Sequence, residues 1–345
     1  MAPRHARWSA LWLSLAAVAL ALGAARELAL QVPVAPRAPF DSTLRERIRD
    51  ERPDVVFLGN SMLGSRLFER RLNRRVAPRR AIVHPKPAAM SSRWYLQLKN
   101  SVLAAGVRPL RVAIFFRDTK LTEPLNHVTV RYHAEFEAES LPDEPTLDRV
   151  LARAREGVRG RLLYDASRLV PLHHLARVVE PALDGGALGV ASAVLGATVG
   201  PDRKRRINAL FDYGGLRRDT RLSPPPAPRP VAYEFDRALQ RSFLPELLAL
   251  GDTPGVSLYF VEVRKSPTDA QVRERPEHLA RYAAALAEHL REHGAHYIDL
   301  YRRLDLSADW FAEGDHIRRD RRIEYTDRFV EAVPELFSLD GRAAR

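Results

Sequence analysis

The sequence predicts an α/β protein built on a parallel β-sheet. Three short apolar segments at 54–58, 80–85 and 111–116 are separated by segments with helical periodicity. Two further apolar segments, 256–263 and 295–300, flank a long amphipathic pattern near the C-terminus. Strands that alternate with helices are typical of a parallel sheet, and the segment 111–116 is apolar on both faces, as a central parallel strand is. With 46% hydrophobic residues in 345, the chain can bury a sizeable core.

The first half of the predicted domain alternates regularly between helix and strand. The expected elements, in order, are a charged helix at 42–53, strand 54–58, a helical segment at 67–75, strand 80–85, a helix at 92–106 and strand 111–116. The first helix is expected to end before Pro53, because the residue before a proline disfavours helical dihedral angles. Gly106 is the expected stop of the helix at 92–106, since glycine often ends helices in a left-handed conformation.

Between about 120 and 230 this alternation gives way to helical and irregular sequence, which predicts an insertion. It contains the glycine-rich segment 181–200, which we interpret as a packed helix or lid rather than as a second membrane span. The alternation then returns as strand 256–263, a helix at 276–294, strand 295–300 and a last helix at 321–337. We therefore expect one α/β domain at 42–338, interrupted by a mostly helical insertion at about 120–230.

The N-terminus has the pattern of an export signal. Arg4, His5 and Arg7 precede an uncharged apolar run of 18 residues from Trp8 to Ala25. A basic flank before such a run predicts a signal anchor or a signal peptide at 1–25, and both alternatives remain open, since spanning a bilayer takes about 20 residues. Proline-rich residues 26–41 are expected to form a tether. The domain would then be membrane-anchored through residues 8–25 and face the periplasm or cell exterior, or be secreted if the leader is cleaved.

Composition excludes some chemistries. The net charge is +12, but arginine far outnumbers lysine and is spread along the chain. With no nucleic-acid-binding motif either, we expect no nucleic-acid partner. The absence of cysteine excludes disulfides, thiolate metal sites and a cysteine nucleophile. His173 and His174 lack a carboxylate at ligand spacing, so the sequence predicts no metal site there.

Two segments at opposite ends of the domain carry candidate catalytic residues. Strand 54–58 runs directly into Gly59, Asn60 and Ser61. A serine becomes a nucleophile when a histidine takes its proton and a carboxylate orients that histidine. The segment "DWFAEGDHI", 309–317, supplies such a histidine after the last expected strand.

A Gly-Asp/Asn-Ser block after the first strand, with an acid-x-x-His block near the C-terminus, resembles the SGNH (GDSL-type) hydrolase superfamily and its membrane-tethered cell-envelope members. The resemblance covers about residues 50–118 and 255–335. It implies a three-layer, flavodoxin-like parallel sheet with Ser61 as the nucleophile and His316 as the general base. Glu313 falls where the family has an aspartate and is the expected acid. Asp315 is the alternative acid.

Two other blocks of the family differ in this chain. The second block usually supplies a glycine N–H to the oxyanion hole, whereas residues 86–94 contain no glycine. The third block usually has an asparagine after a strand, and Arg117 occupies that place. We therefore consider Arg117 a candidate for stabilising the oxyanion by charge, while Gly59 and Asn60 would shape the loop at Ser61, with glycine permitting its tight turn.

The resemblance implies a serine esterase or O-acyltransferase that acts on acyl esters of an exported polysaccharide or another envelope polymer. It implies no metal and no organic cofactor. The expected partners are an ester-bearing carbohydrate or polymer, the membrane, and a membrane-bound acyl-transfer protein. The alternative is a catalytically inactive SGNH-like envelope protein that binds polymer or assists assembly, because part of the usual oxyanion hole is missing.

Overall fold

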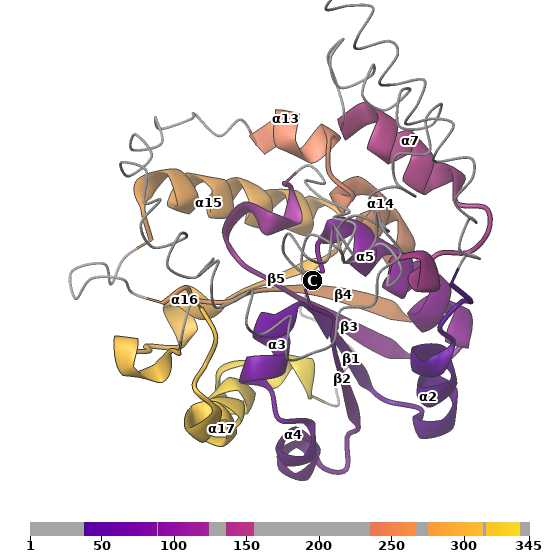
Figure 1. Ribbon diagram of the computed structural model, residues 1–345. Helices are drawn as coiled ribbons and strands as arrows, with labels where there is room; N and C mark the ends of the chain where they lie inside the picture. The colour runs from indigo at the N-terminus through magenta and orange to yellow at the C-terminus, as the bar shows by residue number, and fades with distance from the viewer. Residues whose placement is uncertain are drawn as a thin grey trace, which may run out of the picture. The chain divides into compact units, whose positions relative to one another are not determined.

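The computed structural model (Figure 1) describes residues 38–87, 89–123, 136–154, 235–266, 275–312 and 315–338. These segments belong to one compact unit. The predicted anchor at 1–25, most of the tether and most of the insertion lie outside the described residues. Among the helices within the described ranges, none has the length and apolar character needed to cross a membrane.

Five parallel strands form the sheet in the order β2-β1-β3-β4-β5. The strands are β1 Val55–Gly59, β2 Ala81–Pro85, β3 Leu110–Phe116, β4 Val256–Glu262 and β5 His296–Asp299. The central register aligns Phe57 with Val83 on one side and with Ala113 on the other. The predicted α/β class and the flavodoxin-like strand order are thereby confirmed.

Helices cover both faces of this sheet. The α-helices are α2 Thr43–Glu51, α3 Ser61–Arg66, α4 Glu69–Val76, α5 Ser91–Leu96, α7 Pro145–Ala154, α13 Phe235–Gln240, α14 Leu244–Gly251, α15 Glu277–Glu292, α16 Leu300–Arg303 and α17 Arg322–Ala332. Figure 1 shows α5, α14 and α15 on one face and α3, α4 and α17 on the other. The arrangement is a three-layer α/β/α fold.

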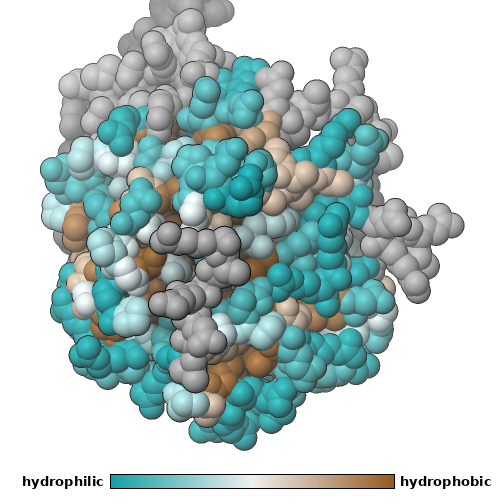
Figure 2. Space-filling view, turned by 180° about the vertical axis from the view of Figure 1, so that it is seen from behind, coloured by the Kyte–Doolittle hydropathy of each residue, from teal (hydrophilic) through white to brown (hydrophobic). Residues whose placement is uncertain are grey.

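The described surface is mainly hydrophilic. Figure 2 shows hydrophilic residues over most of the coloured rear face, with hydrophobic residues in small areas between them. Among the described residues, Leu141 and Ile323 are the large hydrophobic side chains that are exposed. Most apolar side chains are therefore buried in the core, on the two faces of the sheet.

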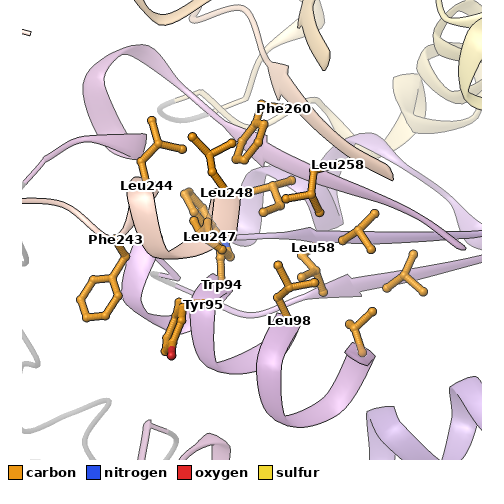
Figure 3. Packing of buried hydrophobic residues seen from close by; sticks show 14 of the residues in the cluster. Leu58, Trp94, Tyr95, Leu98, Phe243, Leu244, Leu247, Leu248, Leu258 and Phe260 are labelled. Carbon is orange, nitrogen blue, oxygen red and sulfur yellow. The ribbon is translucent and has the colours of Figure 1, made fainter. Parts of the chain in front are cut away.

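Alternate residues of the strands divide the core into two clusters. Leu58, Leu258 and Phe260 pack with Trp94 and Leu247 on the α5/α14 face, as Figure 3 shows. This packing buries Trp94 completely. Because strand side chains alternate between faces, the residues between them, such as Phe57, point to the opposite cluster.

On that opposite face, aromatic rings form the centre of the packing. The ring of Phe57 lies 5.7 Å from that of Phe115 and 5.9 Å from that of Phe329, both edge to face. Phe329 belongs to α17, so the C-terminal helix is held directly against β1. Strands buried on both faces explain why continuous apolar segments predicted them correctly.

Four helical elements named here differ from the sequence prediction. The helix expected at 92–106 changes its winding: α5 continues as a π-helical turn, Gln97–Val102, and a 3-10 turn, Leu103–Ala105. It ends at Gly106 as predicted, with a φ of 75°. The last helix stops at Ala332, because Pro334 cannot continue it. Helices α13 and α14 were not expected from the sequence.

Candidate active site

The candidate residues lie along the carboxyl edge of the sheet. β2 pairs with one side of β1 and β3 with the other, while β4 and β5 extend the sheet beyond β3. The chain therefore leaves β1 and β3 in opposite directions, which creates a topological switch point, the usual ligand site of open α/β sheets. Ser61 follows the end of β1 and Arg117 the end of β3.

Asn60 caps the helix that Ser61 begins. Its backbone is extended, and its Oδ1 accepts a hydrogen bond of 2.9 Å from the Met62 N–H. The Leu63 N–H in turn donates to the Asn60 carbonyl at 3.0 Å. The first N–H groups of a helix lack intrahelical acceptors. Asn60 accepts hydrogen bonds from two of them, the N–H groups of Met62 and Leu63. The Ser61 N–H is the first-turn donor that this cap leaves for another acceptor.

Gly59 is required by space. A Cβ at this position would lie 2.7 Å from Leu63 Cβ and 3.1 Å from Phe115 Cβ. The distance to Leu63 is shorter than real contacts between such atoms. The glycine allows α3 to pack directly on β1, which brings Ser61 close to the sheet.

Ser61 and His316 meet at the carboxyl edge although 255 residues separate them. The Oγ of Ser61 lies 2.9 Å from Nε2 of His316. When His316 carries its proton on Nδ1, this geometry allows the serine hydroxyl to donate to Nε2, as a nucleophile–base pair requires. The structure thus brings together the two residues that the sequence assigns as nucleophile and base.

The segment that carries His316 is docked on α3. Phe311 and Ile317 form an antiparallel bridge, and the Ala312 N–H donates to the His316 carbonyl at 2.8 Å. The Ile317 N–H donates to Ser65 Oγ at 3.3 Å. Because Ser65 lies one turn after Ser61, the same helix positions both the nucleophile and the segment of the base.

Arg117 and Asp315 lie beside this pair and contact each other. Arg117 forms an ion pair with Asp315 and also lies 3.5 Å from the Asp118 carboxylate. Oδ1 of Asp315 accepts a hydrogen bond of 3.0 Å from the Ser266 N–H. Both oxygens of Asp315 thus take part in contacts with other segments. Glu313 lies outside the described residues, and its role as the orienting acid stays a prediction.

Sequence reasoning missed Arg66, which lies at the C-terminal end of α3. This side chain is completely buried and donates to the carbonyls of Met62, at 3.3 Å, and Arg264, at 2.9 Å. Its guanidinium lies over the Tyr325 ring, 5.8 Å from the centroid, and burial lowers the pKa of Arg66. It ties α3 to the segment after β4 and to α17. In a chain so rich in arginine, no sequence signal distinguishes it.

A second group missed by sequence reasoning lies at the ends of β4 and β5. Arg275 donates to Glu262 at 3.0 Å and to Asp299 at 2.9 Å, and the Tyr297 hydroxyl donates to Glu262. Glu262 is 1% exposed, and this burial raises its pKa to about 7. The polar row at the carboxyl edge therefore extends from Ser61 across β3 to β4 and β5.

No protein-family model matches the sequence, and no curated protein matches it. The function is therefore inferred from the fold and from the arrangement of side chains at the carboxyl edge.

Proposed function

We propose that the protein is a serine-dependent ester hydrolase or O-acyltransferase of the SGNH type. The observation that carries this proposal is the distance of 2.9 Å between Ser61 Oγ and His316 Nε2. The pair lies at the switch point of the sheet, where substrates reach the edges of two strands. Either reaction begins with the same acyl-serine intermediate.

In the first half of the reaction, Ser61 Oγ attacks the ester carbonyl carbon while His316 Nε2 takes the hydroxyl proton. The carbonyl oxygen becomes an oxyanion, and the Ser61 N–H at the start of α3 is a donor that the Asn60 cap leaves for it. The tetrahedral intermediate collapses as protonated His316 gives its proton to the leaving alcohol oxygen. The products of this half are an alcohol and an acyl-serine.

In the second half, water or a sugar hydroxyl attacks the acyl-serine, with His316 as the base again. Water as acceptor makes the protein an esterase, and a sugar hydroxyl makes it an O-acyltransferase. Glu313 would hold the His316 ring in the productive tautomer, as the resemblance to SGNH hydrolases implies. That resemblance, together with the export signal expected at 1–25, favours an acyl ester of an exported polysaccharide or other envelope polymer as the substrate.

The arrangement around Arg117 bears on the oxyanion hole. Because Arg117 is paired with Asp315, its charge is already partly neutralised. We therefore assign the oxyanion contact to backbone N–H groups and give Arg117 a positioning role on the segment that carries His316. The Ser61 N–H can then donate to the oxyanion, although residues 86–94 contain no glycine that could do so.

A fluorophosphonate probe tests the proposal, because it reacts covalently with an activated serine. The full chain in detergent would be labelled as wild type, Ser61→Ala and His316→Ala. Ser307→Ala is the matched control, since this serine is exposed in the C-terminal segment and its hydroxyl donates to the nearby Asp309. We expect wild type and the control to be labelled equally, Ser61→Ala to be unlabelled, and His316→Ala to react at least about 100-fold more slowly.

Two results would contradict the proposal. One is the absence of labelling in folded wild-type protein. The other is equal labelling of wild type and Ser61→Ala. The first result would favour the non-catalytic, polymer-binding alternative, with Ser61 as part of an ordinary turn. Hydrolysis of an acetyl ester in the same samples would show whether water is accepted by the acyl-serine.

A further inference from the structure

The last turn of α15 brings two imidazoles and a carboxylate together. One ligand atom each from His289, Glu292 and His293 lies within 4.8 Å of the other two. This turn leads into β5 at its N-terminal end, so it lies at the amino edge of the sheet. Ser61 lies at the carboxyl edge, and the three residues on α15 take no part in the proposed acyl chemistry.

These side chains open into a surface pocket of about 470 Å³ between the ends of α14 and α15. Both helices lie on the same face of the sheet (Figure 1). Asp252, the residue after α14, lines the pocket together with the three residues of α15. The pocket therefore offers two imidazoles and two carboxylates at the C-terminal ends of two helices.

Hydrogen bonding fixes the tautomer of one imidazole. Nδ1 of His293 lies 2.8 Å from the His289 carbonyl oxygen. A carbonyl only accepts, so Nδ1 donates to it, and Nε2 is the ring nitrogen of His293 left for a metal ion. Histidine ligands of metals usually donate their second ring N–H to such a carbonyl or carboxylate. His293 thus has the second-sphere contact of a metal ligand.

The ring of His289 also lines this pocket. Its ring lies edge-on to Phe235, at 5.8 Å between centroids, and its Nε2 is buried without a hydrogen-bond partner among the described residues. The His289 and His293 rings are 4.2 Å apart. A metal ion would give the buried Nε2 of His289 a partner.

We propose that His289, Glu292 and His293 bind a divalent transition-metal ion of the Zn²⁺ class, with Asp252 or water as the fourth ligand. Imidazole and carboxylate suit such ions. The C-terminal end of a helix attracts cations. Tetrahedral bonds near 2.1 Å place ligand atoms about 3.4 Å apart, so the exposed side chain of Glu292 rotates inward on binding, while His293 keeps its contact with the His289 carbonyl. With Asp252 as the fourth ligand, the bound ion would fasten the end of α14 to the end of α15.

Titration of the full chain in detergent with ZnCl₂ tests this site. The protein is purified through a tag without histidine and treated with a chelator beforehand. We expect one saturable site with a Kd in the micromolar range or below. His293→Ala and Glu292→Gln should each weaken binding at least tenfold.

Matched controls lie on the same helix. His278→Ala removes an exposed histidine at the other end of α15, and Glu288→Gln removes a carboxylate paired with Arg291. Both should bind Zn²⁺ as wild type does. Co²⁺ provides a second readout, since wild type should show the visible absorption of tetrahedral Co²⁺ and His293→Ala should not.

The inference is overturned if wild type has no saturable site below about 100 μM. It is also overturned if His293→Ala and His278→Ala bind equally, since Zn²⁺ would then bind to other groups. Circular dichroism of each variant verifies that the fold is retained. Because neither readout uses catalysis, the outcome is independent of the acyl chemistry proposed for Ser61.

Discussion

Arg117 and Asp315 form an ion pair that joins the end of β3 to the residue directly before His316. Asp315 also accepts a hydrogen bond from the Ser266 N–H in the segment after β4. Three segments far apart in the sequence are therefore fastened together next to the proposed base. The pair is mostly buried, with Asp315 9% exposed, so water screens it only weakly. Its position indicates that it holds the His316 segment in place.

A positioning role predicts that Arg117→Ala and Asp315→Ala slow fluorophosphonate labelling by similar factors, about tenfold each. The double variant should be little slower than either single variant, because the two residues act as one unit. Labelling rates of the three variants, measured with unfolding curves, check this. If Arg117 instead touched the oxyanion directly, Arg117→Ala alone would cost about 10²–10³-fold and Asp315→Ala much less.

An exposed ion pair in the same region is the control for that experiment. Arg318 and Asp320 pair at 3.0 Å, with side chains 50% and 61% exposed. Exposed pairs contribute about 0–1 kcal/mol. Asp320→Ala should therefore leave both labelling and stability close to wild type.

The strands were predictable from the sequence because they are buried on both faces, and burial on both faces produces continuous apolar segments. The proximity of Ser61 and His316 was predictable, because a strand-loop-serine block and a distant histidine form a recognisable pair. The partner of Arg117 was not predictable. One ion pair among so many arginines leaves no local pattern, and its two residues meet only because the sheet brings the ends of β1 and β3 together.

Close packing at Gly59 predicts that Gly59→Ala destabilises the protein by about 1–3 kcal/mol, the usual cost of overpacking. The added methyl group would contact Leu63 and Phe115 and push α3 away from β1. Since Ser61 begins α3, labelling should slow as well. Urea unfolding together with the labelling rate measures both effects.

Gly64→Ala is the matched control for Gly59→Ala. Its added methyl group would lie 3.2 Å from Pro85 Cβ, a milder contact. Alanine is favoured over glycine in a helix by up to about 1 kcal/mol, which offsets that contact. Its stability should be within about 1 kcal/mol of wild type. A Gly59→Ala protein as stable and as reactive as wild type would refute the role assigned to this glycine.

The raised pKa of Glu262 predicts a stability that depends on pH. Burial raises this pKa from 4.5 to about 7 in the folded protein. Between these values the unfolded chain releases the proton and the folded protein keeps it, so Glu262 lowers stability as pH rises from about 4.5 to 7. Glu262→Gln has no carboxyl group at this position, so this loss of stability is absent from the variant. When the pH is raised from 5 to 8, the free energy of unfolding of the variant should therefore increase by about 2 kcal/mol relative to that of wild type.

Urea unfolding at pH 5 and pH 8 checks this difference. Glu288→Gln is the control, because Glu288 is exposed on α15 and should show the same pH dependence as wild type. The interpretation of Glu262 fails if Glu262→Gln and wild type change in parallel between the two pH values. A parallel change would mean that Arg275 keeps the Glu262 carboxylate ionised throughout.

The lowered pKa of His84, near the end of β2, predicts the opposite dependence of stability on pH. Burial, assisted by Lys86, lowers the pKa of His84 from 6.5 to about 4. As pH falls from about 6.5 to 4, His84 is protonated in the unfolded chain but not in the folded protein. The free energy of unfolding therefore decreases over this pH range. His84→Gln removes the proton site from both states. The variant should therefore gain about 2 kcal/mol relative to wild type between pH 7.5 and pH 4.5, measured by urea unfolding. His278→Gln, at an exposed histidine, should follow wild type, and the same gain in both variants would show that burial of His84 is not the cause.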